Sequence, residues 1–228
     1  KSGSSTTWVL SNHDIIRHAT RFAFPKVSDF AGWYKANRFT AKPDIALGTA
    51  RANAMTMLLL ALPGSTYIYQ GEELALQEVL DIPAEHMQDP QFFRNPELGL
   101  SRDGCRVPLP WAKTGSSFGF GANGSHLPQA AWYGSVSVEA QDGVKGSTLE
   151  LYRELINLRK TLLAPEEYSW VKHWFAPKVL HFARPGGWHS VTNFGNKAVK
   201  LPAGKVLAAS QPLVDGKLPT NTTVWLKA

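Results

Sequence analysis

The sequence has little cysteine, no long hydrophobic run and no secretion-type start. Cys105 is the single cysteine among 228 residues, so an internal disulfide is excluded and a reducing compartment fits. The longest apolar run, MLLLAL at 57–62, is far short of the roughly 18 residues that cross a bilayer. The opening KSGSS lacks the apolar core of a signal peptide. We therefore expect a cytoplasmic protein with no membrane association.

Clusters of basic charge are also lacking. The formal net charge is +6, but lysines and arginines are scattered singly among the acids. Nucleic-acid binding is therefore not expected. Nothing in the sequence around Cys105 is typical of a catalytic thiol, so inert packing is the expected role of this side chain. The 8 Trp and 11 Phe suit sugar stacking, although core packing explains any single ring more simply.

A hydrophobic content of 43% is sufficient for one large core or two smaller ones. The apolar stretch 7–11 predicts a short buried strand that ends in the polar tip Ser-Asn-His-Asp, and a long loop follows over 12–48. The Ala- and Leu-rich segment 45–62 predicts a helix that stops at Pro-Gly. A second buried strand at 65–69 also ends in polar residues, Gln-Gly-Glu-Glu.

The second half changes pattern. Leucines at helical spacing predict a helix over 147–163, where Ser147 and Glu150 have the spacing of a capping box. Beyond it, short alternating stretches separated by turn residues predict an antiparallel sheet. These expected strands are 178–184, 188–193, 198–201, 206–209 and 222–226.

Two strands joined by a helix, each with polar residues at its carboxyl end, are typical of a (β/α)8 barrel, in which the loops after the strands form the active site. A closed barrel requires eight such units, and the sequence supplies two. Two parallel strands alone would leave open edges and an uncovered apolar face. We therefore expect such a chain to pair with a missing half of the barrel or with a second copy of itself.

Three motifs in order resemble one family. WVLSNHD at 8–14, followed by Arg17, is similar to the end of the seventh barrel strand in the α-amylase superfamily, glycoside hydrolase family 13. YIYQGEEL at 67–74 resembles the eighth strand and its exit. SRDGCRVPLPW at 101–111 resembles the following loop in the α-glucosidase and oligo-1,6-glucosidase branch.

The resemblance implies an α/β fold followed by an all-β part. Residues 1–165 would be the C-terminal part of a (β/α)8 TIM barrel, with strands seven and eight and their helices. Residues 166–228 would be a small antiparallel β-sandwich domain.

The resemblance also implies roles for single residues. Asp14 matches the family carboxylate that binds hydroxyls of the cleaved ring and favours its oxocarbenium-like state, and His13 matches a neighbouring sugar ligand. Arg102 matches an arginine that closes the pocket and pairs with an acid from the N-terminal half. The chemistry fits, because a carboxylate accepts from neighbouring hydroxyls and a neutral imidazole both donates and accepts.

Supporting roles are expected for Asn12, Arg17 and Glu72. For Arg17, an ion pair behind the site is favoured over sugar contact, and for Glu72 loop support is favoured over catalysis. Plainer explanations stay open. The segment 11–14 has the composition of a helix N-cap, and Arg102 could be an ordinary surface arginine.

The implied function is a share of a retaining α-glucosidase that acts on short malto- or isomalto-oligosaccharides or on sucrose. Such an enzyme needs a nucleophile and a general acid whose carboxyl groups lie about 5–5.5 Å apart. In the family both precede the segment seen here, so we expect this chain alone to be inactive, with no cofactor and no metal site. The alternative is a catalytically empty module that binds carbohydrate or serves a structural role. The sequence leaves linkage preference and transglycosylation open.

Overall fold

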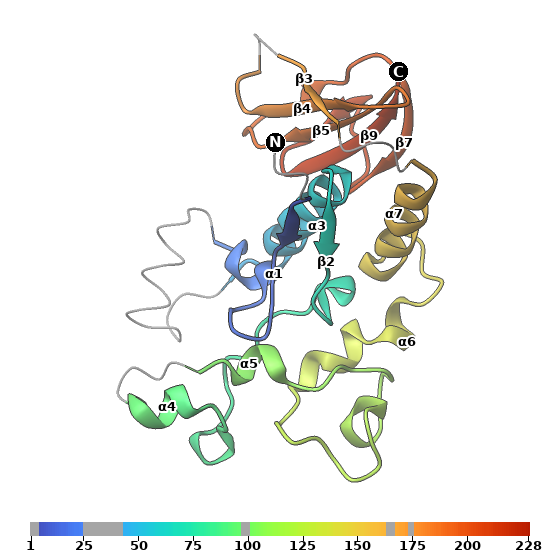
Figure 1. Cartoon of the computed structure of the whole chain (residues 1–228). Coiled ribbons are helices and arrows are strands. Elements are labelled where there is room, and N and C mark those ends of the chain that lie inside the picture. The colour runs from blue at the N-terminus through green and yellow to red at the C-terminus, as the bar shows by residue number, and fades with distance from the viewer. Residues whose placement is uncertain (1–4, 25–42, 97–100, 163–166, 173–175) are drawn as a thin grey trace. The chain divides into compact units, whose positions relative to one another are not determined.

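The computed structural model describes the chain except for residues 1–4, 25–42, 97–100, 163–166 and 173–175 (Figure 1). The chain divides into two compact units. The sheet unit comprises Lys1–Val9, Ala50–Tyr67 and Leu151–Ala228, and the loop unit comprises Leu10–Thr49 and Ile68–Glu150. The proposed domain boundary between residues 165 and 166 stays a prediction.

Two short parallel strands are connected through a long helix. Strand β1 (Thr7–Val9) pairs with β2 (Ser65–Tyr67), and helix α3 (Ile45–Ala61) lies between them in the sequence. The predicted strands and helix are confirmed, although both strands end earlier than expected.

The predicted burial of these strands is wrong. The side chains of Val9 and Tyr67 are 46% and 66% exposed, respectively. The physical reason is that Val9 and Tyr67 are paired residues of a two-stranded sheet in the described part of the chain, so their side chains lie on the same face, and that face is not covered there.

The predicted antiparallel sheet is confirmed, and Figure 1 shows its strands with those nearest the C-terminus in red. Its order is β3-β4-β5-β9-β7, and the two further strands β6 and β8 pair with each other. The strands are β3 (Ser169–Trp170), β4 (Val179–Arg184), β5 (Trp188–Asn193), β6 (Val199–Lys200), β7 (Lys205–Ala209), β8 (Lys217–Leu218) and β9 (Thr222–Lys227). The expected sandwich arrangement of this part of the chain stays a prediction.

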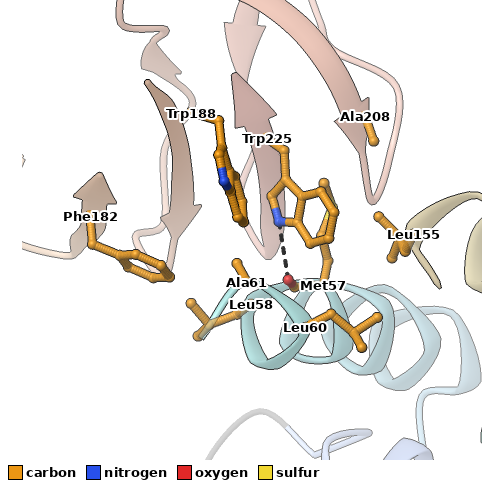
Figure 2. Packing of buried hydrophobic residues seen from close by; sticks show 9 residues of the cluster. All are labelled: Met57, Leu58, Leu60, Ala61, Leu155, Phe182, Trp188, Ala208 and Trp225. Atoms are coloured by element: carbon orange, nitrogen blue, oxygen red, sulfur yellow. Dashed lines mark hydrogen bonds between the residues drawn. The ribbon is translucent and has the colours of Figure 1, made fainter. Parts of the chain in front are cut away.

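Alternating side chains of β9 belong to two hydrophobic cores. Trp225 packs with Phe182 and Trp188 against Met57 of α3, and its indole Nε1 donates to the Met57 carbonyl at 3.1 Å (Figure 2). The flanking residues Val224 and Leu226 belong to a second core with Leu218 and Val191. Successive side chains of a strand point to opposite faces, so β9 contributes to both.

Half of the predicted capping box is present at helix α7 (Thr148–Leu162). Ser147 Oγ accepts from the Glu150 amide at 3.2 Å, but the Glu150 carboxylate accepts from the Gly143 amide at 2.9 Å. The Ser147 amide already donates to the Val144 carbonyl at 3.0 Å, so it does not need the glutamate.

The loop unit consists mainly of short helical turns around a core that includes Leu74, Leu76, Val107, Leu127 and Tyr133. The turns are α1 (His18–Arg21), η1 (Glu72–Leu74), η2 (Ala84–His86), α4 (Pro90–Arg94), α5 (Asp103–Arg106), η4 (Ser116–Gly119), η5 (Ala131–Val136) and α6 (Val138–Gln141). Residues 25–42 of the long loop expected at 12–48 lie outside the described residues, and its described part includes α1 and the first residues of α3. Among the helices that are described, none has the length and apolarity to span a membrane.

Candidate functional site

The polar tip after β1 forms a tight turn whose side chains face solvent. Asn12 Oδ1 accepts from the Asp14 amide at 2.8 Å, which fixes the turn locally. The side chains of His13 and Asp14 are 69% and 50% exposed. Asp14 is not a helix cap, because α1 begins at His18 and its N-cap residue is Arg17. The carboxylate is therefore available for another purpose.

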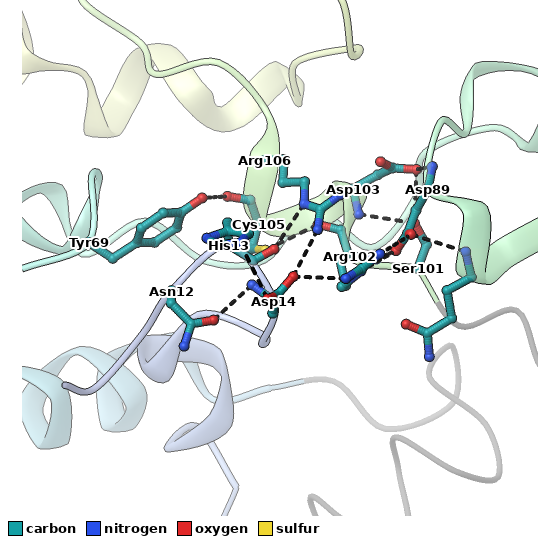
Figure 3. A network of polar contacts seen from close by, with 11 residues as sticks. Asn12, His13, Asp14, Tyr69, Asp89, Ser101, Arg102, Asp103, Cys105 and Arg106 are labelled. Atoms are coloured by element: carbon teal, nitrogen blue, oxygen red, sulfur yellow. Dashed lines mark hydrogen bonds and ion pairs between the residues drawn. The ribbon is translucent and has the colours of Figure 1, made fainter.

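Two guanidinium groups converge on one oxygen of Asp14 (Figure 3). Arg102 Nη1 and Arg106 Nη2 lie 2.8 Å and 3.1 Å from Oδ1. Arg106 Nε also donates to the His13 carbonyl at 2.9 Å. The second oxygen, Oδ2, lies 3.3 Å from His13 Nε2. Asp14 is thus held through Oδ1, while Oδ2 and the imidazole form a polar pair at the surface.

Arg102 is itself fixed by a buried carboxylate. Arg102 Nη2 and Nε donate to the two oxygens of Asp89 at 2.7 Å and 2.8 Å, and the Arg102 backbone amide adds a bond at 2.7 Å. The Asp89 side chain is fully buried. The hydrogen bonds from Arg102 hold the pKa of Asp89 well below its usual range, and Asp89 raises the pKa of Arg102. An ordinary surface arginine would not be held in this two-point, charge-assisted geometry.

The sequence interpretation missed Asp89 and Arg106. The partner acid expected for Arg102 was one from the N-terminal half, whereas in this structure Arg102 pairs with Asp89 and Asp14. Asp89 does carry a local signal, since it precedes Pro90 at the start of α4 and accepts from the Gln91 amide at 3.1 Å. That signal predicts a helix cap and says nothing about Arg102.

The motif at 101–106 has one buried side and one side toward Asp14. Asp103 is buried, and its Oδ2 accepts from the amides of Gln88 and Asp89 at 2.8 Å and 2.9 Å. Arg102 and Arg106 are four residues apart around α5, a spacing that places side chains on the same face of a helix. This spacing is the signal from which Arg106 was predictable.

Cys105 lies on the buried side of the same motif. It is fully buried, and burial raises the pKa of its thiol to about 12. The expected inert packing role therefore agrees with its surroundings.

Arg17 joins the loops through hydrogen bonds to backbone carbonyls. Its Nη1 and Nη2 donate to the carbonyls of Gln70 and Cys105, each at 2.8 Å, and its guanidinium lies 5.2 Å from the centre of the Tyr69 ring. In the described part of the chain its guanidinium hydrogen bonds go to backbone carbonyls, and the expected ion pair stays a prediction. Carbonyl groups left unpaired where the chain turns accept these bonds.

Glu72 lies buried in η1, and burial raises its pKa to about 7. Its Oε1 is 3.6 Å from His18 Nδ1. The neighbouring Glu73 accepts from the Gly71 amide at 2.8 Å, so this carboxylate fixes the backbone at the start of η1.

The best-defined cavity of the loop unit is not at the candidate site. This cavity of about 660 Å³ is lined by residues that include Leu74, Gln77, Trp132 and Gln141, and it contains neither Asp14 nor Arg102. Over the described ranges, no group of three His, Cys, Asp or Glu side chains is arranged to hold a metal ion.

The chain belongs to the alpha-amylase family. The profile described as "Alpha amylase, catalytic domain" matches residues 1–165, and this agrees with the resemblance of the three motifs. Two similar proteins are named α-glucosidases. A probable alpha-glucosidase from Rhizobium meliloti is 34% identical over 72% of this chain and 26% of its own length. A salivary alpha-glucosidase from Anopheles gambiae is 31% identical over 99% of this chain and 33% of its own length.

Other similar proteins are not named as α-glucosidases. An amino acid transporter heavy chain from Rattus norvegicus is 27% identical over 75% of this chain and 23% of its own length. The crystal structure of an alpha-glucosyl transfer enzyme, XgtA, superposes with a TM-score of 0.72 at 29% identity, over 97% of this chain and 40% of that one. The chain thus spans between a quarter and a third of the two α-glucosidase relatives.

Proposed function

We propose that this chain is part of a retaining α-glucosidase that hydrolyses terminal α-glucosidic bonds of short oligosaccharides or sucrose. The observation that carries the proposal is the fixed Asp14 carboxylate. Oδ1 is held by Arg102 and Arg106, and Oδ2 is left beside His13 at the surface. The names of two similar proteins as α-glucosidases support the substrate class.

In this proposal Asp14 binds two neighbouring hydroxyl groups of the ring being cleaved. A carboxylate bound to hydroxyls stabilises the positive charge that develops on an oxocarbenium-like ring, and such hydrogen bonds strengthen in the transition state. Fixing Oδ1 in advance orients Oδ2 before the sugar arrives, so little reorganisation is needed during the reaction.

His13 and Arg102 would complete the sugar contacts. A neutral His13 imidazole donates to one hydroxyl and accepts from another. Arg102, held by Asp89, would form a rigid end of the pocket and favour removal of single terminal sugars. Asn12, Arg17 and Glu72 would support these residues from the turn and from behind it.

The nucleophile and the general acid would come from a part of the protein outside this chain. A retaining glycosidase needs them about 5–5.5 Å apart, and the three family motifs of this chain supply only Asp14 as a carboxylate facing the sugar. The fraction of its relatives that the chain spans supports this assignment. The chain alone would then lack turnover.

Asp14→Asn provides the test. We expect saturation-transfer NMR to show weak binding of methyl α-glucoside by the 228-residue chain. We expect Asp14→Asn to lose that binding, because an amide side chain has one acceptor oxygen where the carboxylate has two. Asp215→Asn is the matched control, since Asp215 is an exposed turn residue with positive φ, a conformation that asparagine also tolerates.

The same two variants should be assayed with p-nitrophenyl α-glucoside. No hydrolysis is expected from any of the three proteins. Turnover by the wild-type chain that Asp14→Asn abolishes would show that other carboxylates of this chain complete the site, and the proposed division of roles would be wrong.

A second function is favoured by one comparison. The similar transporter heavy chain bears a name that is not an enzyme's, which supports a catalytically empty, structural module as the alternative. Sugar binding that is equal in wild type and Asp14→Asn, or absent from both, would favour this alternative.

A further inference from the structure

A buried polar cluster lies directly behind the turn that presents Asp14. Ser11, His18 and Glu72 are 2%, 2% and 6% exposed. Ser11 is the residue before Asn12, and His18 begins α1. The cluster therefore connects the exit of β1, the start of α1 and the η1 turn.

Two hydrogen-bond contacts join Ser11 and His18. Ser11 Oγ accepts from the His18 backbone amide at 2.9 Å, and it also lies 2.9 Å from His18 Nδ1. Glu72 Oε1 approaches the same Nδ1 to 3.6 Å. One ring nitrogen thus faces both a hydroxyl and a carboxyl oxygen.

The cluster also contains polar atoms without partners. Glu72 Oε1 and His18 Nε2 are buried, and neither has a hydrogen-bond partner within the described structure. Such groups are uncommon because each costs desolvation energy. A neutral imidazole carries one N–H, so where that hydrogen sits decides which of these atoms is left unsatisfied.

Two arrangements of hydrogens satisfy the contacts around Nδ1. With the hydrogen on Nδ1, His18 donates to Ser11 and faces an ionised Glu72. With the hydrogen on Nε2, Nδ1 accepts from the Ser11 hydroxyl and Glu72 is in its neutral form. The role of the Ser11 hydroxyl changes from acceptor to donor between the two arrangements.

We propose that Glu72 is a positioning residue for the Asp14 turn, which acts by selecting the His18 tautomer and, through Ser11, the placement of Asn12–Asp14. This inference rests on the proposed function for the meaning of the turn, and on the contacts of Ser11, His18 and Glu72 for its mechanism. Glu72 itself contacts no substrate in this mechanism.

The charges around Glu72 allow it to change state near neutral pH. Burial raises the pKa of Glu72 to about 7, and Glu73 raises it further, while Arg17 and backbone amides act in the opposite direction. Burial, then Arg21 and Arg17, lower the pKa of His18 to about 3, so the imidazole stays neutral. Burial lowers the pKa of Arg21, and the charges of Glu72 and Glu78 act in the opposite direction. The proton therefore moves on and off Glu72 while His18 changes tautomer.

The test is an NMR titration of the isotope-labelled 228-residue chain from about pH 5 to about pH 9. Ring ¹⁵N signals report the His18 tautomer, and amide signals report Asn12, His13 and Asp14. We expect both sets to shift together with a midpoint near pH 7. Glu72→Gln should abolish that transition, whereas Glu85→Gln, at an exposed glutamate of the same unit, should leave it unchanged.

A second variant separates positioning from simple burial. Ser11→Ala removes the hydroxyl link but keeps Glu72, His18 and the hydrogen bond between the Ser11 backbone and Glu72. The His18 ring should therefore still change tautomer, while the amides of Asn12–Asp14 follow it with a clearly smaller shift. The proposal is overturned if wild-type His18 keeps one tautomer throughout, or if the turn amides follow the ring equally well in Ser11→Ala.

Sugar binding distinguishes this inference from the proposed function. The dissociation constant for methyl α-glucoside should change across the same midpoint in wild type, and that change should be absent in Glu72→Gln. A constant that is independent of Glu72 overturns the positioning role. Absence of sugar binding with the NMR transition intact overturns the proposed function instead.

Discussion

At the scale of single residues, Asp89 has the greatest influence on the geometry around Asp14. It accepts three hydrogen bonds from Arg102 and one from the Gln91 amide, and it is fully buried. Arg102 in turn donates to Asp14. The position of the surface guanidinium therefore depends on a carboxylate that no sugar would reach.

Asp89 gives a prediction about acid stability. Its pKa is lower in the folded chain than the usual value of about 3.9, so its contribution to folding is present above about pH 4 and is lost as the pH falls further. We expect the free energy of unfolding of wild type to fall more steeply below about pH 4 than that of Asp89→Asn. Urea unfolding at several pH values measures this, and equal slopes would contradict it.

Glu72 gives a prediction of the opposite sign for the pH dependence of stability. Its pKa is raised from 4.5 to about 7, so folding favours the protonated form. Its contribution is complete below about pH 4.5 and is lost as the pH rises through 7. We expect Glu72→Gln to raise the free energy of unfolding at pH 8 by up to a few kcal/mol and to change it little at pH 4.5. A wild-type stability that does not decline over this range would contradict the assignment.

At the scale of elements, the packing of α3 on the antiparallel sheet depends on Trp225. The indole is fully buried and donates to the Met57 carbonyl. Trp225→Ala should lower the free energy of unfolding by about 3–5 kcal/mol, because it leaves a large cavity. Phe194→Ala is the control, since this ring is 47% exposed and its removal should cost much less. Similar costs for both variants in thermal unfolding would contradict this account of the core.

Elements were predictable from the sequence where local pattern decides them. Composition, leucine spacing, turn residues and alternation located α3, α7, the four longer strands β4, β5, β7 and β9, and the short strand β6. The site was predictable only for residues that lie on motifs, such as Asp14 and Arg102. Partners were not predictable, because Arg102 and Asp14 are 88 positions apart, and only folding determines which acid meets which arginine. Burial of β1 and β2 failed for a related reason, since it depends on neighbouring strands rather than on their own residues.

At the scale of the whole molecule, the exposed edge of the parallel pair determines how the chain should behave in solution. Beside it, the paired residues Val9 and Tyr67 expose apolar side chains on one face of the pair. We expect the isolated chain to self-associate, because open edges and exposed apolar side chains favour pairing. Tyr67→Lys should weaken this association by placing charge on the exposed apolar face. Light scattering with dilution measures it, and a clean wild-type monomer would contradict the expectation.

The buried state of Cys105 has a practical consequence. A thiol that is fully covered and protonated at neutral pH reacts slowly with maleimides and iodoacetamides. The chain has no other cysteine. A cysteine introduced at an exposed position such as Phe194 would therefore carry a fluorophore alone, without any need to remove the native thiol. Such a singly labelled chain would allow its association with a partner to be followed directly by fluorescence anisotropy.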